Sequence, residues 1–479
     1  MDAVMYPVND FGPLMKGLSI GGLGIFHVFM AHFAIGGGML LCFFQWLAMT
    51  GRSKTARVFL DGYFRYLVLI SFVAGALTGV GMWFTSIQVS PVTIGLMIDE
   101  FHWLWAVEWT FFCLEVVAGY AAFKYGHKMT DSARMTLLVL YSFAAWMSLF
   151  WINGILSFQL TPGDWLQTHS MWDAFFNPTF LPSLLYRTIA ALVIAALVAM
   201  VLINLAPGFT REQRQELVHH AAWLMSPMVL MPLLGIWFLA AMPPDSRSWI
   251  MGGSIAMTLM LNLAIAASTL VGGYALVGLI RQKLYVNGAT ATILCVLALA
   301  ATAGGEFVRE GVRKPYTMRE LLYSNAIRPD QITELRQRGL TEIDPFPLRN
   351  ADQLPQQNGK PHPDLIQGAL VFRQQCSICH TTNGVNSLPE LTKSWDRNMK
   401  RQNIAKLQQL KPFMPPFAGT PQELESLVHY VEWLQAEKPT TWPEVRQAAD
   451  YPATLAEIKK WLEEAGTQPA YSIRNKGDR

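Results

Sequence analysis

Cys376-Ser377-Ile378-Cys379-His380 carries two thiols three residues apart, with an imidazole directly after the second thiol. This spacing is typical of covalent c-type haem attachment, in which both sulfurs bond to the haem and the histidine becomes an axial ligand of the iron. Such attachment is completed outside the bacterial cytoplasm. The stretch therefore predicts a small helical cytochrome c domain on the periplasmic side, with one covalent haem c on Cys376 and Cys379 and His380 on the iron.

A second metal ligand is predicted in KPFMPPF at residues 411–417, where Met414 stands between prolines. Prolines stiffen a loop, and a stiff loop can present the thioether sulfur as the sixth ligand of the iron. A methionine standing alone is more often a packing residue than a ligand. Its place after the attachment motif in the same small segment favours ligation by Met414.

The remainder of the chain is too apolar for an ordinary soluble protein. Of 479 residues, 52% are hydrophobic and 15% are charged, with 16 Trp and 27 Phe, which predicts a mostly membrane-embedded protein. The 37 basic and 34 acidic residues leave a net charge of +3, so no nucleic-acid partner is expected. The other three cysteines stand singly in apolar runs and are expected to be inert packing residues: Cys42, Cys113 and Cys295.

Long apolar runs predict eight transmembrane helices, because a helix needs about 20 residues to cross a bilayer. Seven of these runs carry almost no charge: 17–51, 66–98, 135–163, 188–210, 217–244, 248–280 and 284–305. The eighth, at about 100–123, is interrupted only by Glu108 and Glu115. The first run is too long for a cleaved signal peptide, so we expect the helices themselves to direct insertion. The predicted fold is all-α, a polytopic bundle of about eight helices followed by the small cytochrome c domain.

The expected loops differ in basic residues, and this difference predicts the orientation. Basic residues follow the first, third, fifth and seventh spans: Arg52, Lys54, Arg57, Lys124, Lys128, Arg134, Arg211, Arg214, Arg281 and Lys283. The alternate loops, at 90–99, 161–180 and 243–249, carry almost none. By the positive-inside rule both termini and the cytochrome c domain are periplasmic, and the protein is a multi-pass protein of the bacterial inner membrane.

Composition also predicts the domain boundaries. The chain becomes polar from Glu306, and residues 344–364 hold Pro345 and four further prolines, which is typical of a linker. We expect a membrane haem domain at 1–327, a periplasmic linker at 328–363, the cytochrome c domain at 364–437 and a tail at 438–479. Helices are expected at 422–436 and 455–464, from their apolar periodicity.

Ionisable side chains inside membrane helices are costly and usually functional. They are His27, His32, His102, Glu108, Glu115, Arg187 and Glu306. Counted from the outer ends of their spans, His27 and Glu108 lie at a similar depth of about 14 Å. Glu108 and Glu115 share one helical face, which suits proton transfer or a pair of groups facing a haem. Glu306 is expected to join these carboxylates.

Two of the histidines have a second interpretation. His102 stands beside Trp103 and Trp105 near the membrane interface, where it is equally compatible with an aromatic belt. His32 can hydrogen-bond a neighbouring carbonyl group in place of a metal. Both interpretations stay open.

Several short stretches share their order and membrane depth with one known family. They are FHVF at 26–29, AVE at 106–108, FFCLE at 111–115, NG at 153–154 and FVREGVRKPY at 307–316. Over roughly residues 15–327 the chain resembles subunit I of cytochrome bd, the membrane quinol oxidase. The resemblance implies that His27 binds a high-spin haem where oxygen is reduced and that Glu310 binds a second high-spin haem. It also implies one or two non-covalent haems of type b or d, with Glu108 and Glu115 nearby, and a second membrane subunit.

Two features depart from that family. Arg187 stands where the family has the histidine of its low-spin haem, so this haem is absent or is held differently, for example by His32 or His102. Only residues 242–249 join two helices between which the family has a long quinol-binding loop, so quinol oxidation at that place is doubtful. Arg313, near Glu310, and Arg187 are expected to balance haem propionates or carboxylates.

These features predict a respiratory membrane haem oxidoreductase, a cytochrome bd-like enzyme. Electrons from a periplasmic donor such as a cytochrome c would pass through haem c to the haems near His27 and Glu310 and reduce oxygen or another small diatomic. Two alternatives stay open. In one, quinol is oxidised and haem c reduces a periplasmic cytochrome c. In the other, the chain is a non-catalytic anchor and electron wire of a larger respiratory complex.

Overall fold

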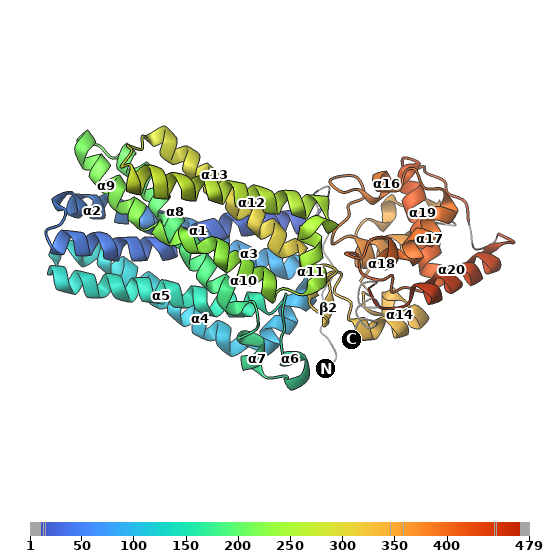
Figure 1. Ribbon diagram of the computed structural model, residues 1–479. Helices are drawn as coiled ribbons and strands as arrows, with labels where there is room; N and C mark the ends of the chain where they lie inside the picture. Colours follow the sequence, from blue (N-terminus) through green and yellow to red (C-terminus); the bar gives the residue numbers. More distant parts are fainter. Residues whose placement is uncertain are drawn as a thin grey trace. The chain divides into compact units, whose positions relative to one another are not determined.

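A computed structural model describes residues 11, 12, 14, 16–344, 346–357, 359–444, 446 and 448–469 (Figure 1). Pro345 and the last residues of the expected tail, 470–479, lie outside the described residues. The chain divides into two compact units. The bundle unit comprises Gly21–Trp83 and Met97–Val312, and the c unit comprises the described residues of 1–20, 84–96 and 313–479.

Among the described residues, eight helices are long and apolar enough to cross a membrane, which confirms the predicted fold class. They span Lys16–Met49, Lys54–Val89, Pro91–Lys128, Asp131–Ser157, Phe180–Leu205, Arg211–Ala241, Ile255–Arg281 and Gly288–Gly311. The α-helices within and between these spans are α1 (Lys16–Met49), α2 (Lys54–Val68), α3 (Ala76–Val89), α4 (Pro91–Tyr125), α5 (Asp131–Ser157), α6 (Trp165–Thr168), α7 (Met171–Phe175), α8 (Phe180–Leu205), α9 (Arg211–Trp223), α10 (Met231–Ala241), α11 (Pro244–Ser248), α12 (Ile255–Gly273) and α13 (Gly288–Gly311).

Glycines bring α1 close to two neighbouring helices, as membrane bundles require. A Cβ atom on Gly36 would lie 1.9 Å from the carbonyl oxygen of Ala191 in α8. A Cβ atom on Gly38 would lie 3.0 Å from Cα of Ser142 in α5. Any larger residue at Gly36 would push the α1 and α8 backbones apart.

The helix boundary near Ser90 differs from the predicted one. The run at 66–98 does not form one helix, because one helix ends at Val89 and α4 starts at Pro91. The loop expected at 90–99 is reduced to Ser90. Proline fits the first turn of a helix, since its missing N–H has no helical partner there. Hydropathy is blind to this break because apolar residues continue across it. A kink at Phe101 (φ −119°, ψ 16°) follows inside α4.

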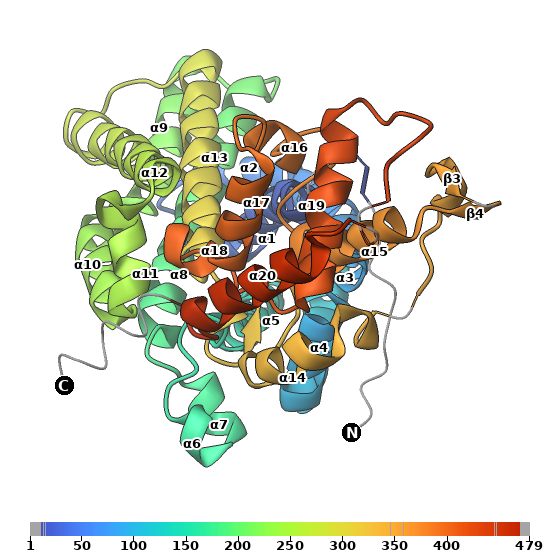
Figure 2. The same cartoon turned by 90° about the vertical axis from the view of Figure 1, so that its right-hand side faces the viewer.

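The c unit is built from short helices and two small β-hairpins (Figure 2). Its helices are α14 (Ile332–Arg338), α15 (Pro363–Val371), α16 (Leu388–Leu391), α17 (Arg397–Ala405), α18 (Leu407–Leu410), α19 (Pro421–Gln435) and α20 (Tyr451–Ala465). Strand β1 (Tyr316–Met318) pairs antiparallel with β2 (Leu322–Tyr323), and β3 (Gln356–Gln357) pairs with β4 (Lys360–Pro361). Helices α15 and α19 cross at Gly368, where a Cβ atom would lie 2.1 Å from the Ser426 carbonyl oxygen.

The c unit extends beyond the predicted domain at 364–437. One apolar core runs from Tyr316 and Ile332 through Leu427 to Trp461. The segment expected as a linker thus supplies α14 and a β-hairpin, and the segment expected as a tail supplies α20, which contacts α17 and α19. Apolar side chains outside the predicted boundaries draw both segments onto this core.

Candidate functional site

The attachment motif forms one tight turn at the end of a helix. Helix α15 continues as a π-helical segment, Phe372–Cys376, and the Cys376 carbonyl oxygen then accepts from the backbone N–H groups of Cys379 (3.1 Å) and His380 (2.9 Å). Burial raises the pKa of the Cys376 thiol to about 12, so the free thiol keeps its proton at neutral pH. The turn brings the two thiols and the imidazole together in one structural element.

His380 is oriented as an iron-binding histidine should be. Its Nδ1 lies 3.1 Å from the backbone oxygen of Asn386, so the Nδ1–H can donate there and Nε2 keeps its lone pair for a metal. The Asn386 side-chain amide donates to the Cys379 carbonyl oxygen at 2.7 Å. Asn386 was not predicted from the sequence, because nothing in its spacing distinguishes it.

Met414 lies in a loop that is fastened to the attachment helix. The Gln375 side chain donates to the Pro416 carbonyl oxygen at 3.1 Å, and its own oxygen accepts from the Ala418 N–H at 3.3 Å. Gln375 is buried and directly precedes Cys376. The structure therefore links the Met414 loop to the attachment turn, through a glutamine that the sequence did not single out.

The exposed apolar surface of this region fits a haem. Between residues 316 and 469, the exposed large apolar side chains of the described chain all lie between His380 and Met414: Val385, Leu391, Met399, Leu410 and Phe413. These five side chains share the sequence interval between the two predicted iron ligands and are candidates for burial against a bound group. A macrocycle held by Cys376, Cys379 and His380 would cover such a surface.

Arg336 also binds the backbone of the Met414 loop. Its guanidinium donates to the carbonyl oxygens of Phe417 (3.0 Å), Leu462 (2.8 Å) and Gly466 (2.9 Å). Burial lowers the pKa of Arg336 to about 10, so it stays charged at neutral pH. One side chain of α14 thus joins the loop to the carboxyl end of α20.

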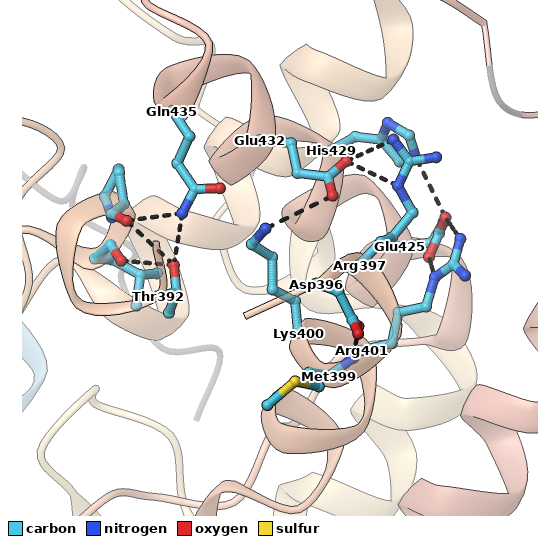
Figure 3. A network of polar contacts seen from close by, with 12 residues as sticks. Thr392, Asp396, Arg397, Met399, Lys400, Arg401, Glu425, His429, Glu432 and Gln435 are labelled. Atoms are coloured by element: carbon cyan, nitrogen blue, oxygen red, sulfur yellow. Dashed lines mark hydrogen bonds and ion pairs between the residues drawn. The ribbon is translucent and has the colours of Figure 1, made fainter. Parts of the chain in front are cut away.

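Helices α17 and α19 are joined by an ion-pair network that is buried at Glu425 and His429 (Figure 3). Arg401 donates to both oxygens of Glu425 at 2.7 and 2.5 Å, and His429 Nε2 lies 3.2 Å from the same carboxylate. Burial alone would raise the pKa of Glu425, but hydrogen bonds from His429 and Arg401 and the Arg401 charge lower it to about 2. Arg397 and Lys400 flank Glu432 in the same network.

In the bundle unit, His27 is held between α1 and α3. Its Nδ1 lies 3.0 Å from the Thr78 hydroxyl, which itself donates to the Ala74 carbonyl oxygen at 2.7 Å. The Thr78 oxygen therefore accepts the Nδ1 proton, and Nε2 is left to bind a metal. Gly79 makes room for the ring, since a Cβ atom there would lie 3.2 Å from Cε1 of His27. These contacts fit the haem-ligand prediction for His27.

The two carboxylates of α4 differ in their surroundings. Glu108 accepts a hydrogen bond of 2.7 Å from the Ser148 hydroxyl of α5. Glu115 is 7% exposed and lies close enough to Glu108 for electrostatic interaction. The structure thus brings the predicted pair together and adds Ser148 to it.

The two histidines with open interpretations differ sharply in burial. His32 is buried, and within the described part of the chain neither ring nitrogen has a hydrogen-bond partner. The carbonyl bond considered for His32 is therefore absent there. His102 is exposed, and its Nδ1 lies 3.3 Å from the Asp99 carbonyl oxygen in its own helical turn. His102 therefore has the surroundings of an aromatic-belt residue.

Arg187 lies in a charged cluster within the bundle unit. Its guanidinium donates to the Asn153 side chain at 3.3 Å and interacts electrostatically with Glu306. Glu306 also pairs with Arg309 at 2.7 Å, and His32 lies within electrostatic reach. Glu306 is thus a charge partner of arginines. Near it in sequence, Glu310 stands in the last turn of α13, and the buried Arg313 follows in the c unit.

Comparisons with known proteins agree with these two units. The family model described as cytochrome C oxidase, cbb3-type, subunit III matches residues 363–431. Among solved structures, the bd oxidase from Geobacillus thermodenitrificans is similar with a TM-score of 0.54 at 14% identity, covering 64% of this chain and 90% of that chain. At this identity the similarity shows the fold alone. A search of curated proteins gives no match. The chain therefore combines a multi-pass membrane bundle with the fold of a bd oxidase and a C-terminal cytochrome c domain of the cbb3 subunit III type.

Proposed function

We propose that this protein is a membrane haem oxidoreductase of a bacterial respiratory chain, in which electrons enter at haem c and reduce oxygen or another small diatomic at a haem near His27 and Glu310. One observation carries the proposal. In a bundle with the fold of a bd oxidase, the Thr78 hydroxyl lies 3.0 Å from Nδ1 of His27, an arrangement that would leave Nε2 for iron, and the same chain carries a cytochrome c domain.

Different residues would hold the covalent and the non-covalent haems. Cys376 and Cys379 would hold haem c, with His380 and Met414 on its iron, while His27 and Glu310 would hold one or two non-covalent haems of type b or d. When bound, haem supplies electron storage and an open position for the diatomic. The protein supplies orientation, through Asn386 at His380 and Thr78 at His27.

Protons and charge would be handled by the ionisable side chains of the bundle. Glu108, oriented by the hydrogen bond it accepts from Ser148, would take up and release a proton, and Glu115 would pass it on. Arg187 interacts electrostatically with Glu306 and would oppose negative charge from propionates, a role we also assign to Arg313. Since Glu306 pairs with Arg309, we place it in charge balance rather than in proton transfer.

The cellular setting follows from the same reasoning. Both termini and the c unit would lie in the periplasm; the haem c attachment motif and the basic loops at 52–57, 124–134, 211–214 and 281–283 support this orientation. A periplasmic cytochrome c would be the electron donor. A second membrane subunit would cover part of the apolar surface of the bundle.

Oxygen consumption by the purified protein tests the proposal. We expect consumption with reduced cytochrome c as donor, and a non-covalent haem whose reduced spectrum changes with carbon monoxide. Quinol-dependent reduction of cytochrome c without oxygen uptake would support the quinol alternative. Activity restricted to a complex with other subunits, and haems that ignore carbon monoxide, would support the electron-wire alternative.

A further inference from the structure

A buried lysine lies against the haem c attachment turn. Lys16, the first residue of α1, donates a hydrogen bond of 2.9 Å to the Ser377 hydroxyl, although 361 positions separate the two in the chain. Ser377 lies between the two attachment cysteines and donates in turn to the Arg373 carbonyl oxygen at 2.5 Å. Lys16 is 3% exposed. Lysine is rarely buried so completely, so its place beside this motif calls for an explanation.

A second lysine approaches the same turn from another part of the chain. Lys314 follows the end of α13 and lies close enough to Cys379 for electrostatic interaction. Both lysines belong to the c unit. Arg373, near the same turn, pairs with Asp344 at 2.7 Å. Lys16 thus bonds to the turn that carries both attachment cysteines, and Lys314 lies within electrostatic reach of it.

These positions affect the haem in a defined direction. Oxidation of the iron adds one positive charge, and a nearby cation in a low-dielectric surrounding opposes that charge. A buried cation is also screened less by salt than an exposed one. The reduced state of the haem is therefore favoured, and the reduction potential rises.

We propose that Lys16 and Lys314 set the reduction potential of haem c, holding it higher than the c unit would without them. Both lysines would act on the iron electrostatically, through space. The inference rests on the covalent haem at Cys376 and Cys379 and is independent of the direction of electron flow.

Redox titration of the full-length, detergent-solubilised protein tests this proposal, with the haem c absorption band as the signal. The ratio of reduced to oxidised haem c is compared at the wild-type midpoint potential. We expect Lys16→Gln and Lys314→Gln each to lower this ratio by about three- to tenfold. For one electron, tenfold corresponds to a shift of about 59 mV. Lys16→Glu should lower it further. Lys16→Arg and Lys314→Arg, which keep the charge, should stay within about twofold of wild type.

The matched control is Lys393→Gln, which removes an exposed lysine of the c unit that pairs with Glu390. It should leave the midpoint unchanged. Two results would overturn the proposal. One is an unchanged midpoint in both Lys16→Gln and Lys314→Gln. The other is a midpoint that falls as far in the arginine variants as in the glutamine variants. If Lys16→Gln fails to take up haem, Lys314→Gln against Lys314→Arg decides alone. Absence of covalent haem in the wild-type pyridine haemochrome assay would instead refute the cofactor assignment on which the proposal rests.

Discussion

The side chain of Gln375 bonds to the backbone on both sides of Phe417, donating to Pro416 and accepting from Ala418. Gln375 directly precedes the first attachment cysteine, and Pro416 follows the predicted ligand Met414 by two residues. The two bonds therefore connect the attachment helix to the Met414 loop. They fix the methionine loop relative to the helix that carries the haem.

Replacing Gln375 by Ala should therefore weaken the bond between Met414 and the iron. The change leaves two buried backbone groups without partners, at a cost of about 1–3 kcal/mol for each. We expect the near-infrared band of sulfur-ligated ferric haem to weaken and the unfolding temperature of the c unit to fall, while covalent haem content stays unchanged. Gln409→Ala, at an exposed glutamine of the same unit, is the control. A full-strength sulfur band in Gln375→Ala would show that the loop holds its place without this residue.

His27→Ala should remove a non-covalent haem and leave the covalent one. Total haem by pyridine haemochrome, compared with haem that resists acid–acetone extraction, separates the two pools. Thr78→Val tests the orientation separately, because it removes the acceptor of the Nδ1 proton but keeps the ligand. We expect partial loss of the same haem in Thr78→Val and none in His102→Ala, since His102 is exposed. Equal non-covalent haem in wild type and His27→Ala would refute the assignment.

The Glu425 carboxylate should make the c unit pH-sensitive in the acid range. Its folded-state pKa of about 2 lies below the ordinary value of 4.5. The stabilisation is therefore fully present above pH 4.5 and is lost as the pH falls toward 2. A shift of this size corresponds to about 3 kcal/mol at neutral pH. We expect Glu425→Gln to lower the stability at pH 7 and to flatten the pH dependence of unfolding between 4.5 and 2, followed by the haem c absorption. The exposed Glu390→Gln should do neither.

The sequence predicted the membrane spans well because a bilayer demands long apolar helices and leaves few alternatives. The spacing of Cys376, Cys379 and His380, which covalent attachment dictates, predicted a cytochrome c domain, and the family match at residues 363–431 confirms that domain; the roles of the three residues stay predictions. The sequence missed the helix break at Ser90, where apolar residues run on across a proline. It also missed Gln375, Asn386 and Arg336, since their partners are backbone atoms, and a carbonyl group leaves no trace in residue type or periodicity.

Composition did not reveal the full extent of the c unit for a related reason. Helix α20 reads as an isolated amphipathic segment, yet its carboxyl end is bound by Arg336 across more than a hundred residues of chain. Lys16 and Ser377 are farther apart still. Composition describes a segment by its own residues, so it cannot reveal which distant surface that segment covers.

The bond between Ser148 and Glu108 offers the last test, and it rests on the proposed oxygen reduction. A carboxylate that delivers protons to a buried haem must hold its proton and then release it, and the Ser148 hydroxyl, at 2.7 Å, orients that carboxylate. We expect Glu108→Gln to lower oxygen consumption by at least about 100-fold, which is the lower end of what a positioned acid–base group contributes. Ser148→Ala should lower it by several-fold. Thr110→Ala, which removes an exposed hydroxyl bonded only to its own helix, should leave the rate unchanged. Haem spectra should be unaltered in all three, so a lost haem in Glu108→Gln would mean that Glu108 supports cofactor binding instead of proton delivery.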